Sequence, residues 1–204
     1  MKLINKLFLV LGLAAALSVA RAGTITFEDM PDAYLFYGGQ TNFGNYWAGI
    51  NFGPSSTILD SVRGGYNSSG YPPHSGTSVL FSISTPYIDA TLDNAIDNFS
   101  FWYSAPQPFA VETYDALDNL LTSTPLASVY GSNQFISVSS PSENIKRIRF
   151  IGTGNYFTID DFTAPFVSGK PRTDTVPDAG SSLILVSLAF ACIAASRRRL
   201  LNQA

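Results

Sequence analysis

Short segments in which apolar and polar residues alternate recur about every ten residues across the middle of this 204-residue chain. Clusters of glycine, proline, asparagine and serine separate them, and residues 23–168 show no convincing run at helical spacing. Alternation with a period of two places side chains on the two faces of a β-strand in turn. The pattern therefore predicts an all-β domain, whose strand segments include TITFED, YWAGINFG, SVLFSIS, YIDATL, IDNFSFWYS, QFISVSS, IKRIRFIG and NYFTIDDFTA.

Roughly eight to ten short antiparallel strands without helices favour a two-sheet antiparallel sandwich of the jelly-roll type. The segment FAVETYDALDNLLTSTPL is expected to form two strands joined at residues 115–119, where aspartate and asparagine favour a turn. Most phenylalanines stand at alternating strand positions, so we expect them to fill the space between the sheets. In NFSFWYS, alternation puts Phe99, Phe101 and Tyr103 on one face and Trp102 on the other.

The first 22 residues have the layout of a secretory signal peptide. Two lysines precede an apolar run over residues 7–19, and the tripeptide Ala-Arg-Ala that ends at Ala22 supplies a small-x-small cleavage site. Such a signal peptide would direct export of the β domain, and cleavage is expected after Ala22. The alternative is an uncleaved N-terminal anchor, although the apolar run is short for a bilayer span.

Charge and residue usage narrow the function classes. Residues 23–168 hold thirteen acidic and four basic side chains, a net charge near −9 that repels nucleic acid and anionic lipid. The single cysteine, Cys192, lies outside this segment, so stability must come from core packing, with or without a bound ion. His74 is the single histidine, and any Ser-His-Asp triad or histidine-containing zinc site would have to use it.

The segment VPDAGSSLILVSLAFACIAASRRR combines a short motif, an apolar run and a basic cluster. As a helix, residues 181–196 would span roughly 24 Å against about 30 Å of bilayer hydrocarbon, so this is a marginal permanent span. A buried core helix is the alternative, but arginines follow at once and the rest of the domain is β. The arginines, which hold their end in the cytoplasm, are Arg197, Arg198 and Arg199.

This order of parts resembles the C-terminal sorting signals of the PEP-CTERM class, in the variant whose motif begins Val-Pro-Asp. The resemblance implies that an exosortase, an integral-membrane enzyme with a cysteine nucleophile, cuts near Val176, Pro177 and Asp178 and releases the domain to the cell surface or beyond. Proline biases the preceding residue to an extended form, which a protease can bind. The expected parts are a signal peptide (1–22), a β-sandwich domain (23–168), a polar linker (169–175) and the sorting signal (176–204) with its membrane-inserting helix.

Acidic residues gather in the first and the last predicted strand, in FEDMPD and FTIDDFT. The pattern resembles carbohydrate-binding jelly-roll modules, whose structural calcium is held by acids at these two places. Calcium takes six to eight oxygen ligands, including carboxylates. The alternative is that these are solvated acids at strand ends. The residues that the resemblance implies for calcium are Glu28, Asp29, Asp160 and Asp161.

Aromatic side chains outside the predicted core are candidates for stacking on sugar rings. Trp102 is one of them because its neighbours on the strand are assigned to the core, and an exposed tryptophan needs an explanation. Packing against loops is the alternative for each. The candidates are Trp47, Tyr66, Tyr71 and Trp102, while His74 is interpreted as a polar loop residue.

The segment NIKRIRF gathers Lys146, Arg147 and Arg149 and carries charge on both sides at its start. Charged edge strands resist pairing with other chains, so an edge strand is the first interpretation. A weak anion site is the alternative.

Together these features predict a non-catalytic exported module that binds polysaccharide of the cell's own matrix or envelope. A structural or adhesive envelope protein without a specific small ligand is the second hypothesis, and a secreted glycoside hydrolase the third. Glycoside hydrolysis needs two carboxyl groups about 5 to 9.5 Å apart in a cleft, whereas the acids here lie mainly at turns and strand ends. The sequence leaves open the glycan, the ion and the oligomeric state.

Overall fold

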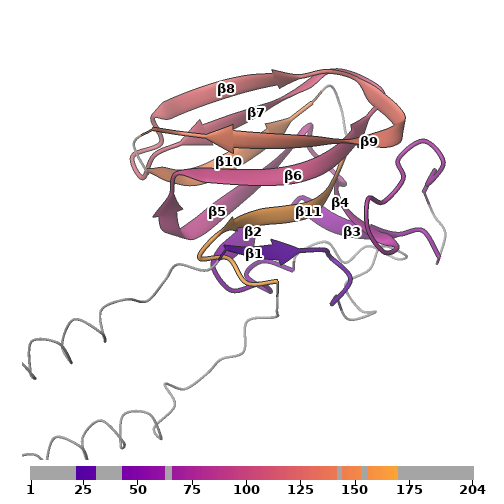
Figure 1. Cartoon of the computed structure of the whole chain (residues 1–204), viewed down its shortest axis with the longest axis horizontal. Helices are drawn as coiled ribbons and strands as arrows, with labels where there is room; N and C mark the ends of the chain where they lie inside the picture. Colours follow the sequence, from indigo (N-terminus) through magenta and orange to yellow (C-terminus); the bar gives the residue numbers. More distant parts are fainter. Residues whose placement is uncertain (1–21, 31–42, 63–65, 142–143, 153–155, 170–204) are drawn as a thin grey trace, which may run out of the picture. The chain divides into compact units, whose positions relative to one another are not determined.

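The computed structural model describes residues 22–30, 43–62, 66–141, 144–152 and 156–169, which form two antiparallel sheets (Figure 1). The first sheet has the order β3-β4-β11-β6-β9, with β1 also paired to β11, and the second has the order β2-β5-β10-β7-β8. The strands are β1 (Ala22–Ile25), β2 (Ile50–Phe52), β3 (Ser56–Asp60), β4 (Ser78–Ser82), β5 (Tyr87–Ile96), β6 (Asn98–Ala105), β7 (Phe109–Tyr114), β8 (Leu120–Leu126), β9 (Val129–Ser139), β10 (Ile145–Ile151) and β11 (Thr158–Pro165).

Strands β4 to β11 follow the path of a jelly roll. Four of them are neighbours in the first sheet, in the order β4-β11-β6-β9, and the other four are neighbours in the second, in the order β5-β10-β7-β8. The chain therefore changes sheet at almost every connection, as two interlocked Greek keys require. The predicted all-β jelly-roll sandwich is confirmed.

The alternation read from the sequence matches the burial of β6. Phe99, Phe101 and Tyr103 are buried between the sheets, while Trp102 points to the outer face and is half-buried. The inward rings pack closely, and Phe101 meets Phe150 of β10 edge-on with ring centroids 5.1 Å apart. Aromatic contacts of this kind across the two layers hold the sheets together.

Trp47 belongs to the same core. Its residue exposure is 1%, and its ring meets Phe27, Phe43 and Phe52 edge-on with centroids 5.3, 5.3 and 5.9 Å away. The prediction that Trp47 contacts a ligand at the surface is therefore wrong, because the ring is enclosed by apolar side chains. The segment around Trp47 enters a strand only at β2, three residues further on.

The turn predicted at residues 115–119 is confirmed. It joins β7 to β8, and the amide of Asp115 donates to the carbonyl oxygen of Asn119 at 3.1 Å. Asp118 adopts a φ of 62°, a left-handed conformation that aspartate tolerates better than most residues.

Two strands differ from expectation. β3 was not predicted, because all five of its residues are buried and alternation is absent from such a strand. The edge-strand interpretation of NIKRIRF is wrong, because β10 lies between β5 and β7. Arg147 and Arg149 stand on the outer face of a central strand instead, while Lys146 lies at a bulge in the pairing with β5.

In the part of the chain that the structure describes, no helix is long and apolar enough to cross a membrane. Ala22, the residue of the predicted signal cleavage, begins β1 and is paired with Pro165. Residues 1–21 of the predicted signal peptide lie outside the described residues, as does the sorting signal with Val176, Pro177, Asp178, Arg197, Arg198 and Arg199.

Candidate functional site

The predicted acidic residues of the last strand lie where β11 changes its neighbour. Thr158 and Ile159 pair with β4, whereas the stretch from Phe162 onward pairs with β1. Asp160 and Asp161 stand between these stretches, at a bulge in the pairing with β6, and Asp161 has a φ of 47°. Bulges redirect side chains, and here they place two consecutive carboxylates beside one loop.

Asp160 is 2% exposed and is held by backbone amides. The amides of His74 and Ser75 donate to its Oδ2 at 2.7 and 3.0 Å, and the amide of Asp161 donates to its Oδ1 at 2.7 Å. Burial raises the pKa of the Asp160 carboxyl to about 7, although these amides favour the charged form. Burial outweighs the amide hydrogen bonds, so the carboxyl takes up a proton near neutral pH.

The same loop, residues 74–78, also binds the carboxylate of Glu28. The amides of Thr77 and Ser78 donate to its Oε1 at 2.9 and 2.7 Å, and the Thr77 hydroxyl donates to Oε2 at 3.2 Å. The loop therefore joins the end of the first strand to the last strand. Asp29 is exposed and lies apart from this contact, with its carbonyl oxygen accepting from the Tyr46 hydroxyl at 2.5 Å.

These contacts bear on the predicted calcium site. The structure brings Glu28, Asp160 and Asp161 to one loop, but across the described ranges no three histidine, cysteine or acidic side chains are grouped so as to hold one metal ion. Amide and hydroxyl groups occupy the carboxylate oxygens, so an ion would have to replace part of those hydrogen bonds. The calcium site stays a prediction.

Trp102 lies in a short row of rings on the outer face of the first sheet. The ring of His74 stacks on it, with centroids 3.6 Å apart and planes 8° apart, and Phe135 of β9 contacts it at 5.4 Å. Asp161 fixes His74, whose Nδ1 lies 2.5 Å from the Asp161 Oδ2. A ligand therefore cannot stack on the Trp102 face that His74 covers, and Phe135 is the more open ring, at 50% exposure.

Tyr66 and Tyr71 lie in the loop that leads to residues 74–78. The Tyr66 hydroxyl oxygen is buried, and burial raises the pKa of Tyr66 to about 12. Tyr71 is half-buried and meets the ring of Tyr130 edge-on, with centroids 5.7 Å apart. Tyr71 can therefore reach a ligand more easily than Tyr66, and ligand binding by either remains a prediction.

A second polar surface, which the sequence did not indicate, covers the outer face of the second sheet. Strand pairing sets its order, because Arg149 of β10 is paired with Asp89 of β5 on one side and with Glu112 of β7 on the other. Arg147 is likewise paired with Tyr114 of β7. We call this surface the arginine–tyrosine face, and its residues are Tyr87, Asp89, Glu112, Tyr114, Arg147 and Arg149.

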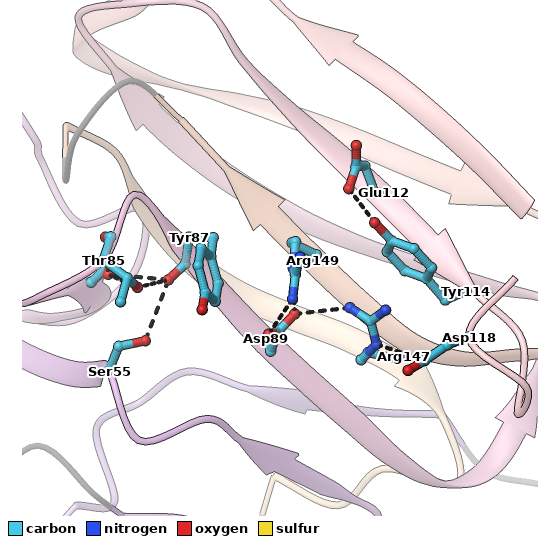
Figure 2. A network of polar contacts seen from close by, with 10 residues as sticks. Ser55, Thr85, Tyr87, Asp89, Glu112, Tyr114, Asp118, Arg147 and Arg149 are labelled. Atoms are coloured by element: carbon cyan, nitrogen blue, oxygen red, sulfur yellow. Dashed lines mark hydrogen bonds and ion pairs between the residues drawn. The ribbon is translucent and has the colours of Figure 1, made fainter. Parts of the chain in front are cut away.

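Asp89 is the centre of the arginine–tyrosine face. Its carboxylate accepts from Nε and Nη2 of Arg149, both at 2.8 Å, and from Nη1 of Arg147 at 3.2 Å. Figure 2 shows Asp89 between the two guanidinium groups, with Tyr87 and Tyr114 at opposite ends of the row. Hydrogen bonding to Asp89 raises the pKa of Arg149, so this guanidinium keeps its charge at any physiological pH.

Each arginine also lies on an aromatic ring. The Cζ atom of Arg147 is 3.7 Å from the ring centroid of Tyr114, and that of Arg149 is 4.4 Å from the centroid of Tyr87. The Tyr114 hydroxyl donates to Glu112, which raises the pKa of Tyr114. Ion pairs and ring contacts together restrict the rotamers of this array, so its donors and acceptors are already in place.

A pocket of about 230 Å³ opens beside the Tyr87 end of this face. The turn at residues 53–55, Ser84 and Thr85 line it, together with Tyr87 and Asp89. The hydroxyl groups of Ser55 and Thr85 donate to the carbonyl oxygen of Tyr87 at 3.4 and 2.6 Å, as Figure 2 shows. The pocket therefore has a mixed polar and apolar lining, and it meets the arginine–tyrosine face at Tyr87 and Asp89.

The arginine–tyrosine face offers hydrogen-bond donors, carboxylate acceptors and aromatic edges on a stable sheet. Arg149 uses two of its five N–H groups in the bonds to Asp89, and a guanidinium has no acceptor. Such a surface can bind an extended, hydroxyl-rich ligand. Alternation in YIDATL, VETY and KRIR could have placed these side chains on one face of each strand, but their register across three strands is not readable from the sequence.

No protein-family model matches the chain, and no curated protein matches it. Among solved structures it is similar to the K2 cleaved adhesin domain of Lys-gingipain, at 16% identity over 70% of this chain and 97% of that chain, with a TM-score of 0.46. It is also similar to the carbohydrate-binding module TmCBM61 in complex with β-1,4-galactotriose, at 14% identity over 56% and 86% of the two chains, with a TM-score of 0.36.

A third similar structure is a glycoside hydrolase family 43 arabinoxylan arabinofuranohydrolase from Bacillus subtilis, in complex with cellotetraose. Identity is 14% over 63% of this chain and 28% of that chain, with a TM-score of 0.39. The structural neighbours are thus carbohydrate-binding modules and adhesin domains, with a hydrolase chain among them.

Proposed function

We propose that this chain is an exported, non-catalytic β-sandwich module that binds polysaccharide through the arginine–tyrosine face. The proposal rests on the fixed arrangement of the side chains on that face. Two arginines, each stacked on a tyrosine, share one carboxylate on the outer side of a central strand. A site held in this way loses little side-chain entropy when a ligand binds.

The charges of the face favour a neutral polysaccharide. Two guanidinium groups stand beside the carboxylates of Asp89, Glu112 and Asp118, and Asp118 accepts from Nε of Arg147 at 2.9 Å. Because these charges nearly cancel and the whole domain is acidic, a polyanion gains little there. Hydroxyl groups can both donate to the carboxylates and accept from the arginines.

The same geometry supports binding over hydrolysis. A glycosidase needs two carboxyl groups that flank the scissile bond. Here Arg149 stands between Asp89 and Glu112 in the strand register, and both carboxylates are engaged with neighbouring side chains. A substrate would have to displace Arg149 before it could lie between them.

Affinity electrophoresis of the full chain in gels cast with neutral polysaccharides tests the proposal. We expect retardation on at least one polysaccharide, a loss of about tenfold or more in affinity for Tyr114→Ala, and a similar loss for Arg149→Ala. Tyr130→Ala is the matched control, because Tyr130 is an exposed tyrosine of the other sheet, and its binding should not change.

Other outcomes have definite meanings. If Tyr130→Ala loses retardation while Tyr114→Ala keeps it, the binding site lies at the loop around Tyr71 instead. No retardation on any polysaccharide would favour the structural or adhesive envelope protein. If the wild-type chain releases reducing sugar from a polysaccharide and the substitution of one carboxylate abolishes this release, the protein is a hydrolase.

For its sorting, we propose export through the signal peptide, transient insertion of residues 181–196 in the inner membrane with the C-terminus in the cytoplasm, and release by an exosortase near Val176, Pro177 and Asp178. The order of motif, short apolar run and arginines supports this proposal. Mass spectrometry of the native protein from cell fractions should show new ends after Ala22 and near Asp178. A mature form that retains Arg197, Arg198 and Arg199 would contradict processing.

A further inference from the structure

The free edges of the two sheets differ in how they are protected. An unpaired edge strand can pair with another chain, so proteins shorten it, bury it, or place charge or proline on it. β1 and β2 are four and three residues long, all five residues of β3 are buried, and β8 contains Pro125. β9 carries neither charge nor proline along its 11 residues, most of which are exposed. Its bulge and the hydrogen bond from the amide of Gly131 to the carbonyl oxygen of Gly70 lie near its start, away from residues 135–139.

The backbone of β9 presents three residues outward. The amide of Ser140 donates to the carbonyl oxygen of Asp97, so hydrogen bonds to the β6 side come from residues 134, 136, 138 and 140. The N–H and C=O groups of Phe135, Ser137 and Ser139 therefore point away from β6. In the described part of the chain no strand pairs with that side of β9, and all three residues are exposed.

The absence of charge on β9 allows a second copy of this chain to be the partner. Residues 119–142 contain no aspartate, glutamate, lysine or arginine, in a domain whose net charge is near −9. A partner chosen by charge would need a charged edge, whereas two identical uncharged edges can meet without repulsion at the contact. The edge residues also suit antiparallel self-pairing about Ser137, where Ser137 meets its twin and Phe135 meets the small side chain of Ser139.

We propose that β9 pairs with β9 of a second copy of this chain, antiparallel and centred on Ser137, and joins two first sheets into one. Three residue pairs with two bonds each give about six backbone hydrogen bonds, and the contact is isologous and closed. The pairing covers the exposed ring of Phe135 and continues its contact with Trp102. It also makes the protein bivalent, so two arginine–tyrosine faces can bind one polysaccharide with higher avidity than a single face.

Site-specific disulfide formation in the full chain tests this pairing. With Cys192→Ser as background, Ser137→Cys supplies the single cysteine, and pairing brings the two Cα atoms to about 5.5 Å, within disulfide range. We expect a covalent dimer on a non-reducing gel after mild oxidation. Ser139→Cys is the matched control, because its twin lies roughly 13 Å away along the strands and should not cross-link.

A second variant pair measures the dimer without cross-linking. Ser137→Lys places two like charges at the centre of the pairing and should shift the sedimentation coefficient of the full chain to that of a monomer. Ser123→Lys, at an exposed position of β8, should leave the dimer unchanged. Equal cross-linking of Ser137→Cys and Ser139→Cys, capture of a different protein by Ser137→Cys, or a monomeric wild-type chain would each overturn the proposal, whether or not polysaccharide binds.

Discussion

The carboxyl group of Asp160 combines burial with three backbone hydrogen bonds, and burial has the larger effect on its pKa. At the scale of single residues, burial also separates the two tryptophans. Trp47 is enclosed by phenylalanines, whereas Trp102 lies under His74 on an outer face. Residue type alone does not distinguish these roles, since both side chains are large, aromatic and flanked by tyrosine in the sequence.

We expect stability to depend on pH through Asp160. A folded-state pKa of about 7 against an ordinary 3.8 means that the folded chain binds this proton more tightly than the unfolded chain. That contribution is fully present below about pH 4 and is lost as the pH rises through 7, at up to roughly 1.4 kcal/mol per pH unit. In chelator-containing buffer, melting temperatures between pH 5 and pH 8 should fall less steeply for Asp160→Asn than for wild type. Equal slopes would contradict this assignment.

Substitution should separate the tryptophans as well. Trp47→Ala removes a ring from the core and should lower the free energy of unfolding by about 3–5 kcal/mol. Trp102→Ala, at a half-buried outer position, should cost under about 2 kcal/mol. Urea unfolding followed by circular dichroism measures both, and a larger cost at Trp102 would show that the outer row of rings stabilises the fold more than the core contact.

At the scale of elements, the loop at residues 74–78 connects the end of the first strand to the last strand. Its backbone amides bind two carboxylates, and the glycine within it allows the close approach. Gly76 has a φ of 55°, and an added Cβ would lie 2.4 Å from the Cδ atom of Glu28. These contacts form only when both the turn and the neighbouring strand are in place, so the conformation of the loop and the position of the strands depend on each other.

Gly76→Ala tests this dependence. We expect it to lower the free energy of unfolding by about 1–3 kcal/mol, because alanine is strained at this φ and its methyl group displaces Glu28. Gly53→Ala is the control, since its Cβ would meet its nearest neighbour at an ordinary 3.4 Å. Chemical denaturation of both variants gives the comparison, and an unchanged midpoint for Gly76→Ala would mean that the loop does not hold the strands.

At the scale of the whole molecule, the jelly-roll path brings residues from both ends of the domain together. β1 and β11 are separated by more than a hundred residues in the chain, yet they are paired from Ala22 with Pro165 to Ile25 with Phe162. This is also where the sequence predicts calcium. An ion there would tie the first strand to the last one and stabilise the folded state by binding it selectively.

Thermal melts with calcium and with chelator decide whether the ion is bound. We expect calcium to raise the melting temperature of wild type and to leave that of Glu28→Gln unchanged, because the amide weakens one of the predicted ligands. Asp97→Asn, which changes an acid between β5 and β6, controls for the loss of a negative charge. An identical midpoint with and without chelator would remove calcium from the site.

The sequence by itself determined the fold class and the core face of most strands, because a period of two is a local property of the chain. It also located the turn between β7 and β8, the outward position of Trp102 and the acids that meet at residues 74–78. Only the tertiary structure decided that β10 is central, that Trp47 is enclosed, and that Asp89 meets both arginines. Those facts depend on strand order and register, which arise from contacts between segments far apart in the chain.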